Sequence, residues 1–186
     1  MGDTRRISEG LNLMYVGNII AIAASLCTLL ALLVPFLVLM TGIAILVGGV
    51  ICLVGLAKLR NEHGDYMNAL VACILGIIFG LLSNNESVFG SMMDLAQSIC
   101  SLIQIYFVIR GTNNFLRIRG YLTEESMGDR AWKWELISVV VSVATAVLAF
   151  VLLPLAFILA IVNMVVSIAA LVFYLSYLKA SAGALS

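Results

Sequence analysis

Six long apolar runs dominate the sequence, at roughly 13–36, 41–58, 67–83, 89–110, 134–153 and 155–178. A helix needs about 20 apolar residues to cross a hydrocarbon core of about 30 Å. Hydrophobic residues make up 63% of the chain and charged residues 11%, whereas about a quarter of the residues of a soluble domain are charged. The runs therefore predict an all-α, polytopic membrane protein, a bundle of six transmembrane helices in a single domain over 1–186.

Pro154 is the only interruption between the fifth and sixth runs. Proline in a helix interior removes a backbone donor and clashes with the preceding turn. One helix through both runs would also be far longer than a bilayer is thick. We therefore expect a tight hairpin at Leu153–Pro154, and we expect the first span to end near Pro35.

The basic residues predict the orientation, because Lys and Arg are enriched in cytoplasmic loops. With the N-terminus inside, all ten lie on the cytoplasmic side: Arg5, Arg6, Lys58, Arg60, Arg110, Arg117, Arg119, Arg130, Lys133 and Lys179. A different number of spans would divide them between the two sides. We therefore expect both termini in the cytoplasm, and a multi-pass protein of the plasma membrane, of the bacterial cytoplasmic type.

One connection is long, the predicted cytoplasmic loop 111–133. Two interpretations are open for it, a solvated loop or a short amphipathic helix that lies on the inner leaflet. In the second, its basic residues contact anionic headgroups of the lipid bilayer, each contributing about 1 kcal/mol. The candidate headgroup contacts are Arg117, Arg119, Arg130 and Lys133. The rings of Trp132, Trp134, Tyr66, Tyr174 and Tyr177 lie where an inner aromatic belt is expected.

Small residues recur at helical spacing in the second and third runs. Helices in a membrane associate through close packing of such residues and through hydrogen bonds, because lipid tails are as apolar as leucine. The candidate packing positions are Gly48 and Gly55 in the second run and Ala72, Gly76 and Gly80 in the third. We expect these two neighbouring helices to cross closely.

The fourth run is the most polar of the six and carries an acid. Asp94, Gln97, Ser101 and Gln104 follow one another at steps of three and four residues, which predicts one face of a helix. Ionisable residues within membranes are candidates for functional sites. Three interpretations are open: a hydrogen-bonded seam between helices, a path for a solute or ion, and a contact with a partner protein.

The sequence does not favour an enzyme, a metal site or a bound cofactor. Covalent hydrolysis needs a nucleophile held against a base, and the apolar runs hold no His for that task and only one Lys, Lys58 at the end of the second run. His63 is the single histidine and is expected in a short inner loop. The four cysteines lack the spacing of a metal site and are expected to pack as small hydrophobic residues: Cys27, Cys52, Cys73 and Cys100.

Two classes of function fit these features. The first is a non-catalytic structural or accessory membrane component that acts by assembly with itself or with another membrane protein. The second is a small transporter or channel for a solute or ion, lined by the polar face of the fourth run. The net charge of zero predicts no nucleic-acid partner.

Overall fold

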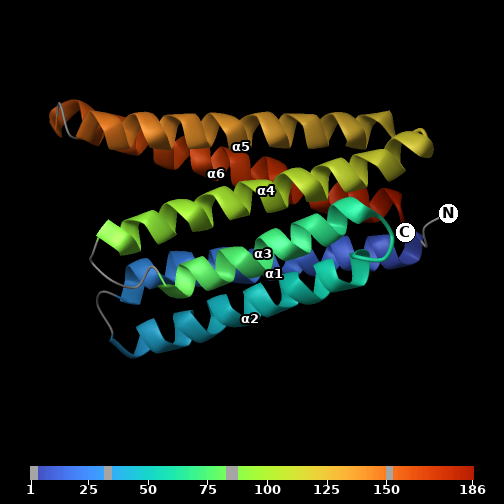
Figure 1. The fold of residues 1–186 in the computed structure, drawn as a ribbon, viewed down its shortest axis with the longest axis horizontal. Coiled ribbons are helices and arrows are strands. Elements are labelled where there is room, and N and C mark those ends of the chain that lie inside the picture. Colours follow the sequence, from blue (N-terminus) through green and yellow to red (C-terminus); the bar gives the residue numbers. More distant parts are fainter. Residues whose placement is uncertain (1–3, 32–34, 83–87, 150–152) are drawn as a thin grey trace. The chain divides into compact units, whose positions relative to one another are not determined.

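The computed structural model describes residues 4–31, 35–82, 88–149 and 153–186, and each regular element in these ranges is a helix (Figure 1). The helices are α1 (Thr4–Ala31), α2 (Pro35–Leu59), α3 (Gly64–Leu82), α4 (Val88–Ile118), α5 (Leu122–Ala149) and α6 (Leu153–Ala184). The all-helical class predicted from the apolar runs is confirmed for these residues.

Five of the helices contain stretches that are long and apolar enough to cross a membrane: Thr4–Ser25, Met40–Leu59, Gly64–Leu82, Met92–Ile118 and Ile158–Ala184. No such stretch lies within the described part of α5. Charged residues occupy the first half of this helix, from Glu124 to Glu135. Apolar sequence follows and continues past the end of the helix at Ala149. The length and composition of the five helices identify a multi-pass membrane protein.

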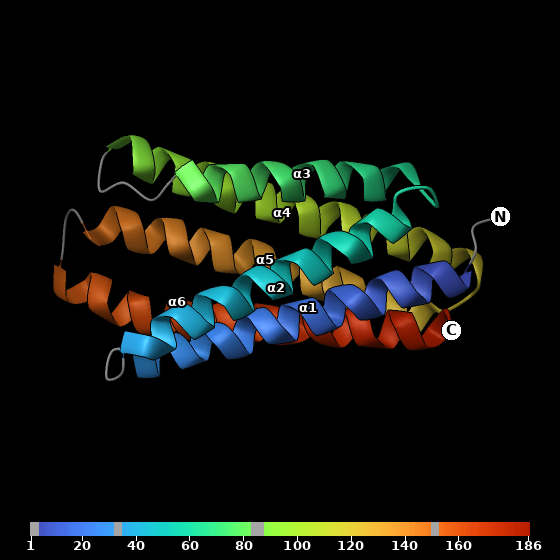
Figure 2. The same cartoon turned by 90° about the horizontal axis from the view of Figure 1, so that it is seen from below.

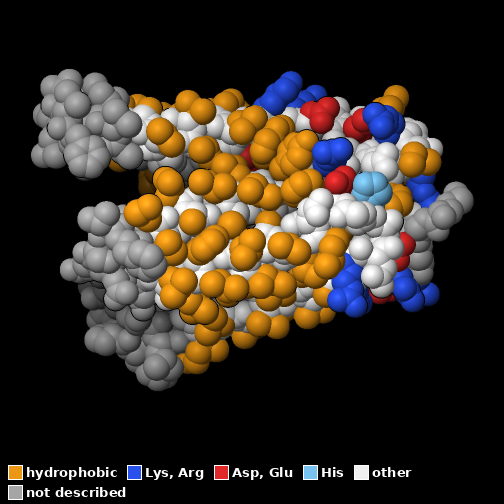
Figure 3. All heavy atoms as spheres, viewed as in Figure 1, with side chains coloured by type: hydrophobic (Ala, Val, Ile, Leu, Met, Phe, Trp, Pro, Cys, Tyr) orange, Lys and Arg blue, Asp and Glu red, His pale blue; other side chains and the backbone are white. Residues whose placement is uncertain are grey.

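Large hydrophobic side chains cover the outer faces of these helices. Leu46 of α2 is 67% exposed and Leu81 of α3 is 73% exposed. Figure 3 shows hydrophobic side chains along the length of α2 and α3, and charged side chains at the end where α2 leads into α3. Soluble monomers rarely expose an apolar surface of this extent, so these faces suit contact with lipid tails.

Most of the segment 111–133 is helical, which corrects the prediction of a loop. The fourth helix continues to Ile118, and the fifth begins at Leu122. Between them the chain turns at Gly120, which has a φ of 80°. The amides of Tyr121 and Gly120 donate to the carbonyl oxygens of Leu116 and Arg117 at 2.9 and 3.1 Å, the pattern of a Schellman helix end. The segment therefore contains no separate amphipathic helix.

The helices form two compact units. Unit 1 is Met1–Thr112 with Leu178–Ser186, and unit 2 is Asn113–Tyr177. In unit 1, α1 lies along α2 and α3 lies along α4; in unit 2, α5 lies along α6 (Figures 1 and 2). The fully buried side chains of unit 1 include Ile7, Leu11, Met14, Leu56, Leu59 and Tyr66. They come from the start of α1, the end of α2 and the start of α3.

Glycines bring the backbones of α1 and α2 into direct contact. A Cβ added at Gly48 would lie 2.7 Å from the carbonyl oxygen of Gly17 and 3.0 Å from the amide nitrogen of Ala21. A Cβ added at Gly55 would lie 2.7 Å from the carbonyl oxygen of Gly10. Only glycine permits this approach, because any side chain would overlap backbone atoms of the facing helix.

The partner predicted for the small-residue face of α2 was wrong, because this face packs on α1 and not on α3. The corresponding face of α3 packs on α4: a Cβ at Gly76 would lie 3.4 Å from the Cβ of Cys100. Ala72 is buried on the same helix. A row of small residues marks where a helix is approached closely, but it does not identify the neighbour that approaches.

Both prolines lie in the first turn of a helix. Pro154 is the second residue of α6. The predicted break between the fifth and sixth runs is confirmed because α5 ends at Ala149, but the hairpin expected at Leu153–Pro154 is wrongly placed, since both residues belong to α6. Residues 150–152, which follow α5 in the sequence, lie outside the described residues. Pro35 is the first residue of α2, whereas we expected it to end the first span; α1 already ends at Ala31. Proline is favoured at a helix start because the amides of the first turn have no partner within the helix.

Candidate functional site

The polar face predicted on α4 divides into a half-buried part and an exposed part. Gln97 and Gln104 are half-buried. The amide of Gln97 lies over Gly80 of α3, where an added Cβ would be 2.9 Å from Nε2. This glutamine therefore takes part in the packing of α3 on α4, in the way expected of a helix seam.

Asp94, Ser98 and Ser101 form the exposed part of the face, one turn apart along α4. The Ser98 hydroxyl donates to the carbonyl oxygen of Asp94 at 2.9 Å, and the Ser101 hydroxyl donates to that of Gln97 at 3.1 Å. These bonds to the preceding turn satisfy the hydroxyl protons within the helix. Ser98 was not among the predicted residues, although its spacing from Asp94 and Ser101 would have placed it on this face.

Charged residues of unit 1 pair at one end of their helices. Glu9 of α1 lies 3.4 Å from Arg5 and 3.3 Å from Lys58 at the end of α2. Asp65, at the start of α3, lies 3.6 Å from Arg110 of α4. The Glu9 pairs are exposed and contribute little stability, whereas the side chain of Asp65 is only 13% exposed. The pairs join the ends of α1 and α2, and those of α3 and α4.

Tyr66 is buried at the same end of unit 1, next to these ion pairs. Its hydroxyl forms a hydrogen bond of 2.9 Å with that of Thr112, which is also fully buried. Tyr174 and Tyr177 are also buried, with 4% and 0% exposure. The prediction that these three tyrosines form an aromatic belt was therefore wrong, because their rings lie inside the protein and not at the lipid headgroups.

In unit 2, Asn113 joins the end of α4 to both α5 and α6. Its Oδ1 accepts a hydrogen bond from the hydroxyl of Tyr177 at 2.8 Å. Its Nδ2 donates to Oδ1 of Asp129 at 3.3 Å and to the carbonyl oxygen of Glu125 at 3.4 Å. The side chain lies against Gly128, where an added Cβ would be 2.5 Å from Oδ1. Neither Asn113 nor Gly128 had been singled out, because both were assigned to the loop.

Hydroxyls and one amide form a seam between α5 and α6. The hydroxyls of Ser138 and Ser167 lie 2.9 Å apart, and that of Ser142 donates to Oδ1 of Asn163 at 2.9 Å. The α5 residue advances by four from the first bond to the second, whereas its partner on α6 moves back by four. The two helices therefore run antiparallel. Each polar group thereby gains a partner in a stretch where an unsatisfied group is costly.

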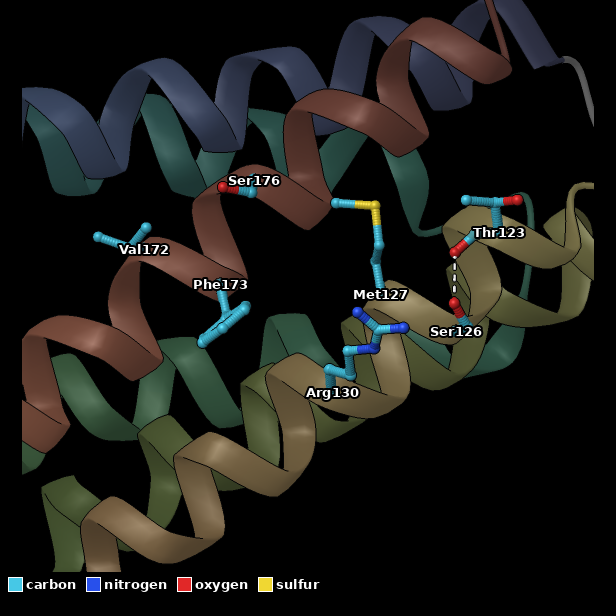
Figure 4. Close-up of a pocket in the computed structure, with 7 residues that line it drawn as sticks. All are labelled: Thr123, Ser126, Met127, Arg130, Val172, Phe173 and Ser176. Atoms are coloured by element: carbon cyan, nitrogen blue, oxygen red, sulfur yellow. Dashed lines mark hydrogen bonds between the residues drawn. The ribbon is translucent and has the colours of Figure 1, made fainter.

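A cavity of about 400 Å³ opens between the first half of α5 and the second half of α6 (Figure 4). It is lined by Thr123, Ser126, Met127, Arg130, Val172, Phe173 and Ser176. Its lining includes one aromatic ring, that of Phe173, which stacks on Trp134 with centroids 5.5 Å apart. The lining thus combines one cation and three hydroxyls with the apolar side chains of Met127, Val172 and Phe173.

The four predicted headgroup contacts are all exposed. Arg117 is in the last turn of α4, and Arg119 follows it in the turn to α5. Arg130 and Lys133 project from α5, and of the four only Arg130 lines the cavity. Sequence reasoning had assigned all four to one loop, so the cavity could not be foreseen. The signal that predicts this helix face is the spacing of Thr123, Ser126, Met127 and Arg130.

Among the described residues, no group of His, Cys, Asp and Glu has the arrangement of a metal site. The four cysteines carry free thiols, and that of Cys52 donates to the carbonyl oxygen of Met14 at 3.6 Å. His63 lies 3.4 Å from Asp65 at the exposed start of α3. The contacts of Cys52 between α1 and α2 are those of a packing residue.

Comparison with known proteins provides no relative from which a role can be transferred. The chain matches no model of a protein family, no curated protein and no solved structure. The roles of its residues therefore follow from their own contacts and chemistry.

Proposed function

We propose that the chain crosses the membrane six times, with the start of α1 and the end of α6 in the cytoplasm. Support comes from unit 1, where the Ser8 hydroxyl donates to the carbonyl oxygen of Ala182 at 2.6 Å. Two points of a chain that touch on one side of a bilayer are separated by an even number of crossings. Five spans would leave these residues on opposite sides, so α5 is the additional span.

The pairing of α5 with α6 supports the same count. Ser167 and Asn163 lie in the spanning stretch of α6, and both bond to side chains of α5. A helix that pairs with a spanning helix at these positions lies at the same depth in the bilayer. The ion pairs of Arg5, Lys58 and Arg110 support the orientation, because they gather basic residues at one end of unit 1.

Cysteine labelling in intact cells tests this topology. Under the proposal, Arg119→Cys and Ser186→Cys react with a membrane-impermeant maleimide only after the cells are permeabilised, and Asn84→Cys reacts without that step. If α5 did not cross the membrane, Arg119→Cys and Ser186→Cys would label from opposite sides. The parent protein, with its four cysteines in the helices, measures the background.

We further propose that the protein acts without catalysis, as a structural or accessory component of the membrane that functions by assembly. The observation that carries this proposal is the exposed row of Asp94, Ser98 and Ser101 on a spanning helix. A carboxylate that faces lipid costs up to about 3 kcal/mol, depending on its depth. A second copy of the chain, or another membrane protein, would remove this cost by covering the row.

A small transporter or channel for a solute or ion is the second candidate, and the exposure of the Asp94 carboxylate favours it. In this function the row would face a water-filled path, with Asp94 as its charged group. The packing of Gln97 on Gly80 and the internal bonds of the two hydroxyls favour the first candidate, because these groups are already used within the protein.

The two candidates predict different behaviour of the Asp94→Asn variant. Assembly predicts that Ser98→Cys forms a cross-linked adduct in native membranes, that Asp94→Asn lowers its yield several-fold, and that proteoliposomes show no flux above empty liposomes. Transport predicts flux of a test cation that falls about tenfold or more in Asp94→Asn. The matched control is Asp129→Asn, because Asp129 lies in unit 2 outside this row and should leave both readouts unchanged.

A further inference from the structure

The cavity between α5 and α6 has the chemistry of an amphiphile site. Its lining offers the guanidinium of Arg130 and the hydroxyl of Ser176, whereas the hydroxyl of Ser126 already donates to the carbonyl oxygen of Thr123 at 2.7 Å. Guanidinium groups bind phosphate through paired N–H donors, and hydroxyls add further donors. The lining residues Met127, Val172 and Phe173 are apolar and suit a hydrocarbon group. Figure 4 shows that α5 and α6 both contribute polar and apolar side chains to the lining.

Acidic residues on this part of α5 point away from the cavity. At about 3.6 residues per turn, the lining residues of α5 occupy one face of the helix, and Lys133 lies beside it. The acids fall on the other faces: Glu124, Glu125, Asp129 and Glu135. Asp129 accepts a hydrogen bond from Asn113, which fixes its direction. The local field at the cavity is therefore positive, and an anion fits there.

An apolar track continues from the cavity along α6. Ile161, Val165, Ile168 and Val172 follow at steps of three and four residues, and each is more than half exposed. Exposed branched side chains on one face of a spanning helix suit contact with an acyl chain. A soluble anion would use the mouth of the cavity but would leave this track uncovered.

We propose that this cavity binds an anionic glycerophospholipid, with its phosphate at Arg130 and one acyl chain along the track on α6. This proposal rests on the six-span topology, which puts the cavity at the level of the inner headgroups. The labelling experiment reports on that topology whether or not lipid binds. An incorrect topology can therefore be distinguished from a cavity that does not bind lipid.

Tryptophan fluorescence tests the site, because Trp134 stacks on the lining residue Phe173 and the chain has only two tryptophans. In the Trp132→Phe protein, Trp134 is the sole emitter. The purified full chain is placed in phosphatidylcholine nanodiscs, and phosphatidylglycerol with brominated acyl chains is titrated against brominated phosphatidylcholine. We expect saturable quenching that favours phosphatidylglycerol.

Two variants that each remove one positive charge test whether the preference for phosphatidylglycerol depends on the cavity. Arg130→Gln should lower the preference for phosphatidylglycerol about fivefold, the factor expected for one basic residue near an anionic surface. Arg119→Gln removes the same charge outside the cavity and should leave the preference unchanged. An equal loss in both variants, or no preference in the parent, would overturn the proposal. Competition by millimolar glycerol phosphate would also overturn it, by identifying a soluble anion as the ligand.

A cavity-filling variant keeps the test independent of Arg130. Ser176→Phe leaves the charge in place and fills the opening from α6, so it should reduce quenching by phosphatidylglycerol to the level seen with phosphatidylcholine. Ser186→Phe, on the exposed last residue of unit 1, is the control. Unchanged preference in Ser176→Phe would show that the lipid binds elsewhere.

Discussion

Replacement of Gly48 by leucine is expected to lower the free energy of unfolding of unit 1 by about 3 kcal/mol or more. The new side chain would meet the carbonyl oxygen of Gly17 at its first carbon atom, at 2.7 Å. Backbone atoms of a helix cannot move aside singly, so α1 and α2 must separate. The change should appear as a lower midpoint of thermal unfolding in detergent.

Gly49→Leu is the matched control for this prediction, because Gly49 is adjacent in the sequence and has open space around its Cα. It should keep the parent stability. A local readout is alkylation of Cys52, whose thiol lies between α1 and α2 and should react faster in Gly48→Leu. Similar melting of the two leucine variants would refute close contact between these helices.

Asn113→Ala is expected to destabilise unit 2 by about 2 kcal/mol, within the range for removing one partner of a buried hydrogen bond. The change removes the acceptor of the Tyr177 hydroxyl and the donor to Asp129. Tyr177 and Asp129 each lose this hydrogen bond at the junction of three helices. Urea or heat unfolding followed by the fluorescence of Trp132 and Trp134, both in unit 2, measures the loss.

A double-mutant cycle separates the hydrogen bond from the other effects of this substitution. Tyr177→Phe removes the donor, and the double variant with Asn113→Ala should be less destabilised than the two single changes combined, by about 1 kcal/mol. Tyr121→Phe, on an exposed tyrosine, should change stability little. Strict additivity of Asn113→Ala and Tyr177→Phe would mean that their contact contributes nothing.

The spanning helices were predictable because hydrophobicity over about 20 residues follows from the thickness of a bilayer. The break near Pro154 was predictable for a similar reason, since the chemistry of proline acts locally. Among the candidate residues, the closeness of Gly48 to another backbone also followed from its size alone. Such properties depend on one residue or one run and need no knowledge of its neighbours.

The helical character of 111–133 was missed because polarity marks where a chain leaves the membrane, not where its helix ends. The actual end depends on Gly120, which adopts a left-handed conformation that most residues avoid. Because this stretch was assigned to a loop, the contacts of Asn113 and the lining of the cavity by Arg130 remained hidden. The packing of α2 on α1 was missed because the choice of partner depends on the residues of both helices, and the glycines of α2 alone do not identify it.

The hydrogen bond between Ser8 and Ala182 has a consequence for biogenesis. Unit 1 combines residues synthesised first with 178–186, which the ribosome adds only after all of unit 2. At about 5–20 residues per second, α1 is complete several seconds or more before the segment that supplies Ala182, the hydrogen-bond partner of Ser8, is synthesised. Insertion of the early helices therefore precedes the closure of their own unit, and the translocon or a membrane chaperone would meet unit 1 in an open form.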